Sequence, residues 1–337
     1  MKQLIYLAIA SLMLSCSSNS VKENFPVLSG EYLGQNQPKD SAILFAPNIV
    51  SSGLGDRDLA ITPDGKEIFF TRNLGNLKYF TIFHSMQQDG IWTKPEVFKY
   101  CKDSKNNYTE PFINADGSKL FFVSDKSQNE DDERNYDIWV CDKDENNEWT
   151  EPYNLGEPVN TDQNEFYPTL TNDGTIYFNH FDEKLKAEFI YRSKLVDGEY
   201  TEPEMLNENI NCGRARFNAY ISPDESFIIV PVYGMPDSYG ATDYYIVFRD
   251  QNDNWSQPMN MGEKVNSKNG QEWSASISPD GKYLFYMSGK TPIDIVKGNE
   301  FSSDLFDKTH NSPQNGYSDI YWISTDLIKD LKKNAVF

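Results

Sequence analysis

The sequence predicts an all-β protein folded as a single β-propeller of four-stranded antiparallel blades. Three observations lead to this prediction. A hairpin pattern recurs five times along the chain, aromatic residues are abundant, and a strand-like segment before the first repeat matches a strand that the last repeat lacks.

The recurring hairpin consists of a short apolar strand, a Pro-Asp-Gly-type turn and an aromatic strand. Asp-Gly between alternating apolar residues is a strong hairpin signal, and repeats of this length are typical of propellers and solenoids. The turn aspartates are spaced by 52, 57, 51 and 56 residues and are Asp64, Asp116, Asp173, Asp224 and Asp280.

A third and a fourth strand follow each hairpin. The third is clearest at 137–140 and 319–322, and the fourth follows a short turn that begins with Trp92, Trp149, Tyr200 or Trp255. Four antiparallel strands make a propeller blade. The last repeat ends after its third strand, so we expect segment 42–47 to close the ring as its fourth strand. The count is five blades, with six as the alternative.

Composition supports a folded protein that does not bind nucleic acid. The 337 residues carry 51 acidic against 31 basic side chains, a formal charge of −20, and 14% are aromatic. An acidic surface repels phosphates, and the aromatic content favours strands over disorder.

The N-terminus has the pattern of a lipoprotein signal. Lys2 precedes a short apolar run that ends at Cys16, followed by a polar Ser-Ser-Asn-Ser tether. We therefore expect a signal peptide at 1–15, a lipidated Cys16 with its tether at 16–40, and the propeller at 41–337. The protein is then anchored in the cell envelope, at the outer membrane; an ordinary secretory signal with an incidental cysteine is the alternative.

The three remaining cysteines, Cys101, Cys141 and Cys212, are widely spaced and form no CxxC or His-Cys motif. Such a set predicts neither a disulfide framework nor a zinc site. We expect no metal and no cofactor.

The repeats resemble those of TolB-like β-propellers, in particular exported lipoproteins of the Bacteroidetes type. The resemblance covers about residues 30–326 and includes Gly-Gln-Asn-Gln-Pro at 34–38 and Phe-Ala-Pro at 45–47. It implies a propeller fold, and it implies binding scaffolds, peptidase gating domains or carbohydrate-active proteins as functions. Propeller-shaped uronate lyases and a dehydratase of ulvan breakdown belong to the last group.

The repeats also act as an internal alignment of one mouth of the ring, the channel end where the first strand of each blade begins. Eight residues before the turn aspartate stand Asp56, Tyr108, Glu165, Arg216 and Glu272, and six before it stand Asp58, Glu110, Tyr167, Asn218 and Ser274. The second strands end there with Arg72, Ser124, His180, Val232 and Ser288.

Arginine is concentrated at this predicted mouth. The chain has seven arginines, and four of them are Arg57, Arg72, Arg214 and Arg216. The guanidinium fork matches carboxylate or sulfate, so the concentration favours an anionic ligand. The alternative is that these arginines pair with the acidic residues of the mouth and hold the blades together.

The function that follows is elimination on an anionic oligosaccharide. An arginine neutralises a uronate carboxylate, and His180 or Tyr167 removes the adjacent proton. The predicted catalytic residues are His180, which we expect across the mouth from Arg216, together with Tyr167, Arg72 and Arg216. The predicted substrate-binding residues are Arg57, Arg214, Glu110, Glu165, Asn218, Tyr233, Glu272, Trp273 and Lys290.

Three other functions remain open. A glycosidase would use Glu110 with Glu165 or Glu272 as its acid pair. A non-catalytic lipoprotein would bind glycan or a partner protein on Trp273, Tyr167, Tyr108 and Tyr233. A third possibility is an envelope scaffold that binds a protein partner through the outer blade edges.

Overall fold

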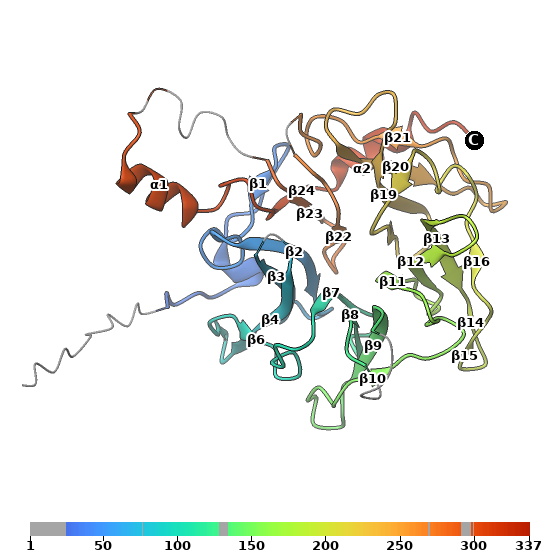
Figure 1. Ribbon diagram of the computed structural model, residues 1–337, viewed down its shortest axis with the longest axis horizontal. Coiled ribbons are helices and arrows are strands. Elements are labelled where there is room, and N and C mark those ends of the chain that lie inside the picture. Colours follow the sequence, from blue (N-terminus) through green and yellow to red (C-terminus); the bar gives the residue numbers. More distant parts are fainter. Residues whose placement is uncertain (1–24, 76, 128–133, 269, 291–297, 299) are drawn as a thin grey trace, which may run out of the picture.

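The computed structural model shows a ring of five blades around a central axis (Figure 1). It describes residues 25–75, 77–127, 134–268, 270–290, 298 and 300–337. The predicted signal peptide and Cys16 lie outside the described residues, as does the acidic segment 129–133. Among the helices of the described part, none is long and apolar enough to cross a membrane.

Each blade is an antiparallel sheet whose first strand lies innermost. Blade 1 consists of β2 (Gly55–Ile61), β3 (Glu67–Leu74), β4 (Tyr79–Gln88) and β6 (Glu96–Val97), with β5 (Ile91–Trp92) paired to the end of β4. Blade 2 consists of β7 (Tyr108–Ile113), β8 (Lys119–Ser124), β9 (Asp137–Asp142) and β10 (Tyr153–Asn154).

Blade 3 consists of β11 (Glu165–Leu170), β12 (Ile176–Asp182), β13 (Ala187–Ser193) and β16 (Glu204–Met205), and it carries a small hairpin of β14 (Leu195–Val196) and β15 (Glu199–Tyr200). In blade 4, β17 (Ala215–Arg216) and β18 (Tyr220–Ile221) both pair with β19 (Phe227–Tyr233), followed by β20 (Thr242–Phe248) and β21 (Met259–Asn260). Blade 5 consists of β22 (Ala275–Ile277), β23 (Tyr283–Ser288), β24 (Asp319–Ser324) and the N-terminal β1 (Ile43–Leu44).

The predicted ring closure is confirmed. Ile43 and Leu44 of β1 pair with Trp322 and Tyr321 of β24, so the first and last parts of the chain share one sheet. Closure covers β24 with a short outer strand, as in the other blades, so the long edge of β24 is not left unpaired. Within the described ranges, three short helices flank the blades: η1 (Glu31–Gly34), α1 (Ser303–His310) and α2 (Asp326–Lys332).

The turn aspartates fix the hairpins in the same way in all five blades. Each carboxylate accepts a hydrogen bond from the backbone N–H two residues later, at 2.8–3.1 Å, from Lys66, Ser118, Thr175, Ser226 and Lys282. In blade 4, Glu225 takes the place of glycine and adopts a φ of 54°. The repeated Asp therefore has a structural role, because it replaces a backbone partner in the turn.

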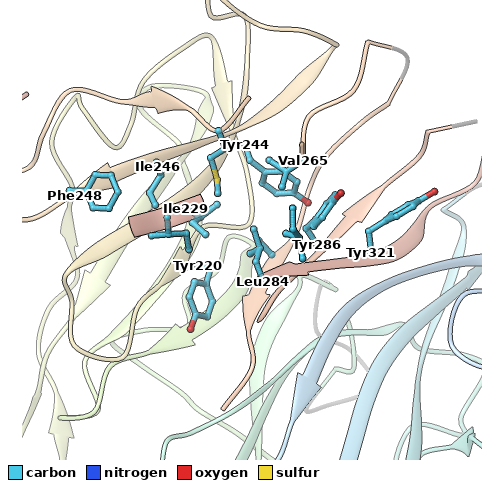
Figure 2. Close-up of a cluster of buried hydrophobic side chains, with 13 residues drawn as sticks. Tyr220, Ile229, Tyr244, Ile246, Phe248, Val265, Leu284, Tyr286 and Tyr321 are labelled. Atoms are coloured by element: carbon cyan, nitrogen blue, oxygen red, sulfur yellow. The ribbon is translucent and has the colours of Figure 1, made fainter. Parts of the chain in front are cut away.

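Hydrophobic clusters fill the spaces between neighbouring blades. The one between blades 4 and 5 contains Tyr244 and Tyr286 and is extended by Ile328 of α2 (Figure 2). At three other interfaces, the tryptophan that opens the fourth strand of one blade packs toward the preceding blade, as Trp92, Trp149 and Trp255 do.

Candidate functional site

The internal alignment of the mouth agrees with the observed strand register. Asp56 lies opposite Arg72, Glu165 opposite His180, and Arg216 opposite Val232. In blade 5 the Ser288 hydroxyl donates to Glu272 at 2.8 Å. The residues eight before the turn aspartate and those that end the second strand therefore lie at one end of the ring, as the repeats predict.

The residues six before the turn aspartate adopt a left-handed conformation in four blades. The φ angles are 57° for Asp58, 59° for Glu110, 51° for Tyr167 and 31° for Asn218. In the first three blades the strand register shifts at this point. Such a conformation costs about 1–3 kcal/mol for a residue other than glycine, so the surrounding contacts must stabilise it.

Those contacts form a polar network on the axis of the ring, made of Arg57, Asp58, Glu110, Tyr167 and Asn218, which we call the axial network. Glu110 is its centre. Its Oε1 accepts from the Arg57 guanidinium at 3.0 Å and from the Asn218 amide at 2.8 Å. Its Oε2 accepts from the Tyr167 backbone N–H at 2.7 Å. Residues from four blades thus meet on one carboxylate.

The axial network is buried, and burial controls its protonation. Glu110 is 5% exposed, and loss of solvation raises its pKa to about 7, although the Arg57 guanidinium opposes this shift. Tyr167 is 6% exposed, and burial holds its pKa well above the ordinary value. Its hydroxyl donates to the Ala275 carbonyl at 2.7 Å. This placement speaks against Tyr167 as a catalytic base and against Glu110, Asn218 and Arg57 as direct substrate ligands.

Two of the four mouth arginines pair with acids, which is the structural alternative left open by the sequence. Arg57 lies 2.8 Å from the Asp58 carboxylate and 3.0 Å from Glu110. Arg72 donates to Asp56 at 2.6 Å and to the carbonyl of Val50 at 2.9 Å. Arg72 therefore links β3 to β2 and to the segment that leads from β1 into blade 1. These contacts do not support its predicted catalytic role.

Arg216 and Arg214 differ from this pair. No carboxylate of the described residues lies within ion-pair distance of Arg216, which donates to the carbonyls of Cys212, Glu188 and Gly213. Burial without an acidic partner lowers its pKa. Three of its five N–H groups are used and two are not, but the residue is only 5% exposed, so side chains beside it must move before a ligand can reach them. Arg214 is exposed beside Gly234.

His180 is held by a carboxylate. Its Nδ1 lies 2.8 Å from Oε1 of Glu165, which also accepts from the Thr161 hydroxyl at 2.8 Å. Among the described residues Nε2 has no hydrogen-bond partner, and the side chain is 19% exposed. The expectation that His180 faces Arg216 across the mouth is wrong. Arg216 lies over the ring of Phe189, which pairs with His180 in the same sheet.

Blade 5 contributes two buried acids with unpaired atoms. Oε2 of Glu272 and Oδ1 of Asp319 have no hydrogen-bond partner among the described residues, and burial raises the pKa of each to about 7. Lys290 lies over the Tyr321 ring at 3.9 Å, and burial lowers its pKa. Lys290 is therefore covered by tyrosines, and its ammonium is not free in the mouth.

The mouth also has an aromatic rim that the sequence analysis found only in part. The residues seven before the turn aspartate in blades 3, 4 and 5 are the half-buried Phe166, Phe217 and Trp273. The rings of Phe217 and Trp273 lie 6.4 Å apart, and the Arg57 guanidinium lies 5.7 Å from the Trp273 ring. Phe166 and Phe217 were missed, although the repeat alignment that finds Trp273 also locates them.

A cavity of about 310 Å³ adjoins this rim between blades 5 and 1. Trp273, Gln271 and Tyr317 line one side of it, and Leu77 and Asn73 line the other. Tyr233, the last residue of β19 in blade 4, is 45% exposed, whereas Tyr108 is 3% exposed and packs in the core. Trp273 and Tyr233 therefore remain as platform residues, and Tyr108 and Tyr167 do not.

The mouth shows no set of donors for a metal ion. Within the described residues, no group of three or more His, Cys, Asp or Glu side chains could hold one.

Comparison with known proteins gives distant similarities only. No family model and no curated protein matches the chain. An exo-beta-1,3-galactanase from Clostridium thermocellum is 12% identical with a TM-score of 0.46, over 79% of this chain and 58% of that one. The catalytic domain of a Coprinopsis cinerea GH62 alpha-L-arabinofuranosidase is 11% identical with a TM-score of 0.45, over 80% and 90%. A luciferin-regenerating enzyme is 11% identical with a TM-score of 0.42, over 83% and 94%.

Proposed function

We propose that this propeller binds an anionic oligosaccharide at the mouth and breaks it by elimination, with His180 as the base. The observation that carries the proposal is the arrangement of His180 in blade 3. Glu165 fixes Nδ1 at 2.8 Å, so that Nε2 is left to accept a proton. A carboxylate that orients a histidine in this way sets the tautomer needed for general base catalysis.

The neighbouring arginines supply the second requirement of an elimination, which is a positive charge beside the substrate carboxylate. A uronate carboxylate bound by the two remaining N–H groups of Arg216, with Arg214 at the surface, loses its charge repulsion toward the developing carbanion. The Nε2 atom of His180 then takes the proton from the carbon beside the carboxylate. A carbon–carbon double bond forms and the bond to the leaving oxygen breaks; this oxygen takes the bonding electron pair and a proton from water, and His180 later returns its proton to solvent.

The aromatic rim supplies the binding surface. Sugar rings present C–H faces that pack on aromatic side chains, and Trp273 with Phe217 offers such a surface beside the cavity of about 310 Å³. The proposal includes the location that the sequence predicts, in which a lipid attached to Cys16 anchors the propeller in the cell envelope.

The test uses the purified propeller with defined uronate oligosaccharides. Turnover is followed by the absorbance of the new double bond and by product mass. His180→Gln is expected to lower kcat by a factor of about 10²–10⁴, the usual contribution of a general base, without loss of binding. Undiminished turnover in a folded His180→Gln protein would refute the assignment of the base.

A second function is favoured by the axial network. Asp58 and Glu110 are buried and bonded to protein groups, so the channel centre provides structure and not reactivity. A propeller that only binds glycan would keep Trp273 as its platform. Saturable binding that Trp273→Ala abolishes, with no product from any uronate or neutral oligosaccharide, would establish this function in place of the first.

A further inference from the structure

A groove of about 920 Å³ lies between blades 2 and 3, on the side of the Asp-Gly turns and away from the mouth. Its floor is apolar and consists of Phe121, Val140 and Leu170. Tyr153 of β10 and Tyr200 of the β14–β15 hairpin form its walls; β10 lies at the bottom of Figure 1 and the hairpin at its lower right. Neither the repeat pattern nor the mouth chemistry assigns a role to it.

The groove lies where the repeat departs from its own pattern. In three blades the fourth strand opens with a tryptophan that packs toward the preceding blade and is 2–7% exposed: Trp92, Trp149 and Trp255. Blade 3 has Tyr200 at this position. The cluster between blades 2 and 3 contains eight buried hydrophobic residues and no tryptophan, whereas the others contain twelve or thirteen. The cluster between blades 4 and 5 also lacks a tryptophan, but tyrosines such as Tyr244 and Tyr286 fill it, so the interface between blades 2 and 3 combines a missing indole with the smallest cluster.

The rim of the groove is acidic. Four carboxylates line it, and they are Asp116, Asp173, Glu157 and Glu199. Hydrogen bonds from Ser118 and Thr171 to the turn aspartates lower the pKa values of Asp116 and Asp173, so both are charged at neutral pH. The cation of the groove is Lys119, which donates to the Asp142 carboxylate and lies 3.3 Å from the Tyr153 hydroxyl. Lys119 is thus neutralised by a partner of its own.

We propose that this groove is a docking site for a partner protein that inserts an aromatic side chain flanked by basic residues. Three of the four other interfaces hold an indole at this repeat position, and the carboxylates of the rim select positive charge around an inserted aromatic ring. Hydrophobic burial of one large aromatic ring supplies affinity, and charge complementarity supplies specificity and orientation.

The probe is a lysine–tryptophan–lysine peptide amide, and a glutamate–tryptophan–glutamate amide is its matched control. Binding to the propeller is measured at low salt by calorimetry, or by NMR of a peptide whose tryptophan carries an isotope label. We expect saturable binding of the basic peptide, weaker binding as salt is added, and at least tenfold weaker binding of the acidic peptide. Absence of saturable binding, or equal binding of both peptides, would overturn the proposal.

Two variants locate the site. Tyr200→Trp restores the residue of the other blades and is expected to raise the Tm and to weaken peptide binding at least tenfold. The pair Glu157→Gln with Asp173→Asn is expected to weaken binding about fivefold, because two exposed rim charges are lost. The control pair, Asp326→Asn with Asp330→Asn on α2, removes the same charge elsewhere. Unchanged binding in a folded Tyr200→Trp protein, or equal loss in the control pair, contradicts the groove as the site.

Discussion

His180 and Glu165 are directly opposite residues of neighbouring strands, and their side chains meet at 2.8 Å. Glu165 has a structural role independent of the histidine, since it accepts the Thr161 hydroxyl and backbone N–H. Asp56 binds Ser52 in the same way in blade 1. The repeat therefore supplies a structural acid at the mouth, and blade 3 adds a histidine to it.

This relationship gives the first prediction. Glu165→Gln keeps the shape of the side chain but removes the carboxylate that orients His180, so kcat should fall at least about tenfold with little change in KM. Asp56→Asn is the matched control, because it alters the equivalent acid of a blade that has no histidine there. Turnover in the oligosaccharide assay and the Tm from calorimetry separate an effect on catalysis from an effect on stability. Equal loss of kcat in both variants would show that Glu165 acts only through stability.

The second prediction concerns stability at neutral pH. Burial raises the pKa of Glu110 to about 7 from an ordinary value near 4.5. The folded state therefore holds a proton that the unfolded state releases, and the stability this provides is complete below about pH 4.5 and lost as the pH rises through 7. Asp319 and Glu272 shift in the same direction.

We therefore expect the free energy of unfolding to be larger at pH 5.5 than at pH 8. Glu110→Gln should make this difference smaller, because glutamine does not ionise. Glu110→Ala should cost about 3–5 kcal/mol, since it leaves Arg57 buried without one of its acids. Urea unfolding at several pH values measures the free energy of unfolding of the wild type, of Glu110→Gln and of Glu110→Ala. A Glu110→Gln protein with the full pH dependence of the wild type would contradict the assignment.

The third prediction concerns the loss of stability at acid pH. Glu67 accepts from His84 at 2.9 Å, from Lys143 at 2.6 Å and from Trp149 at 3.0 Å between blades 1 and 2. These bonds lower its pKa to about 2 although burial opposes them. The stability they provide is present above about pH 4.5 and lost as the pH falls toward 2. Glu67→Gln should therefore flatten the loss of stability between pH 4.5 and 2, measured by the same unfolding series.

The sequence predicted the architecture well because the hairpin turns are local. The Asp side chain bonds its own backbone two residues later in every blade, so a short pattern determines each turn. Register follows from the turn, and the pairing of Glu165 with His180 or Asp56 with Arg72 could be read by counting residues. Ring closure followed from one missing strand.

The site was predicted less well because side-chain direction is not local. The left-handed residues at Glu110 and Tyr167 turn these side chains onto the axis, where burial removes them from a substrate. No sequence pattern predicts this left-handed conformation, since Glu and Tyr rarely adopt it. The sequence also did not predict whether an arginine donates to a carboxylate or to a backbone carbonyl. Arg72 and Arg216 occupy the same mouth, yet only Arg72 has a carboxylate partner within the described residues.

The fourth prediction separates the two candidate bases. Tyr167→Phe removes the hydrogen bond to the Ala275 carbonyl and should lower stability by about 1 kcal/mol. Turnover should be retained, because the hydroxyl is buried and donates its proton to a backbone carbonyl. Loss of turnover in Tyr167→Phe at unchanged Tm would transfer the role of base from His180 to Tyr167.

The last prediction tests the difference between Arg72 and Arg216. Arg72→Met leaves Asp56 uncompensated, and Asp56 is 0% exposed, so the variant should lose about 3–5 kcal/mol of stability. Arg216→Met leaves no acid of the described residues unpaired, because its partners are three carbonyls. Its main effect should fall on an anionic ligand, as at least a tenfold rise in KM for a uronate oligosaccharide.

Binding of a neutral oligosaccharide of the same length provides the control for Arg216→Met, because stacking on Trp273 does not depend on charge. Arg216→Lys should recover part of the uronate affinity, since it keeps the charge but loses the fork geometry. If Arg216→Met weakens neutral and uronate ligands equally, then Arg216 only holds the loop that contains Cys212 and Gly213, and the anionic subsite of the proposed reaction is absent.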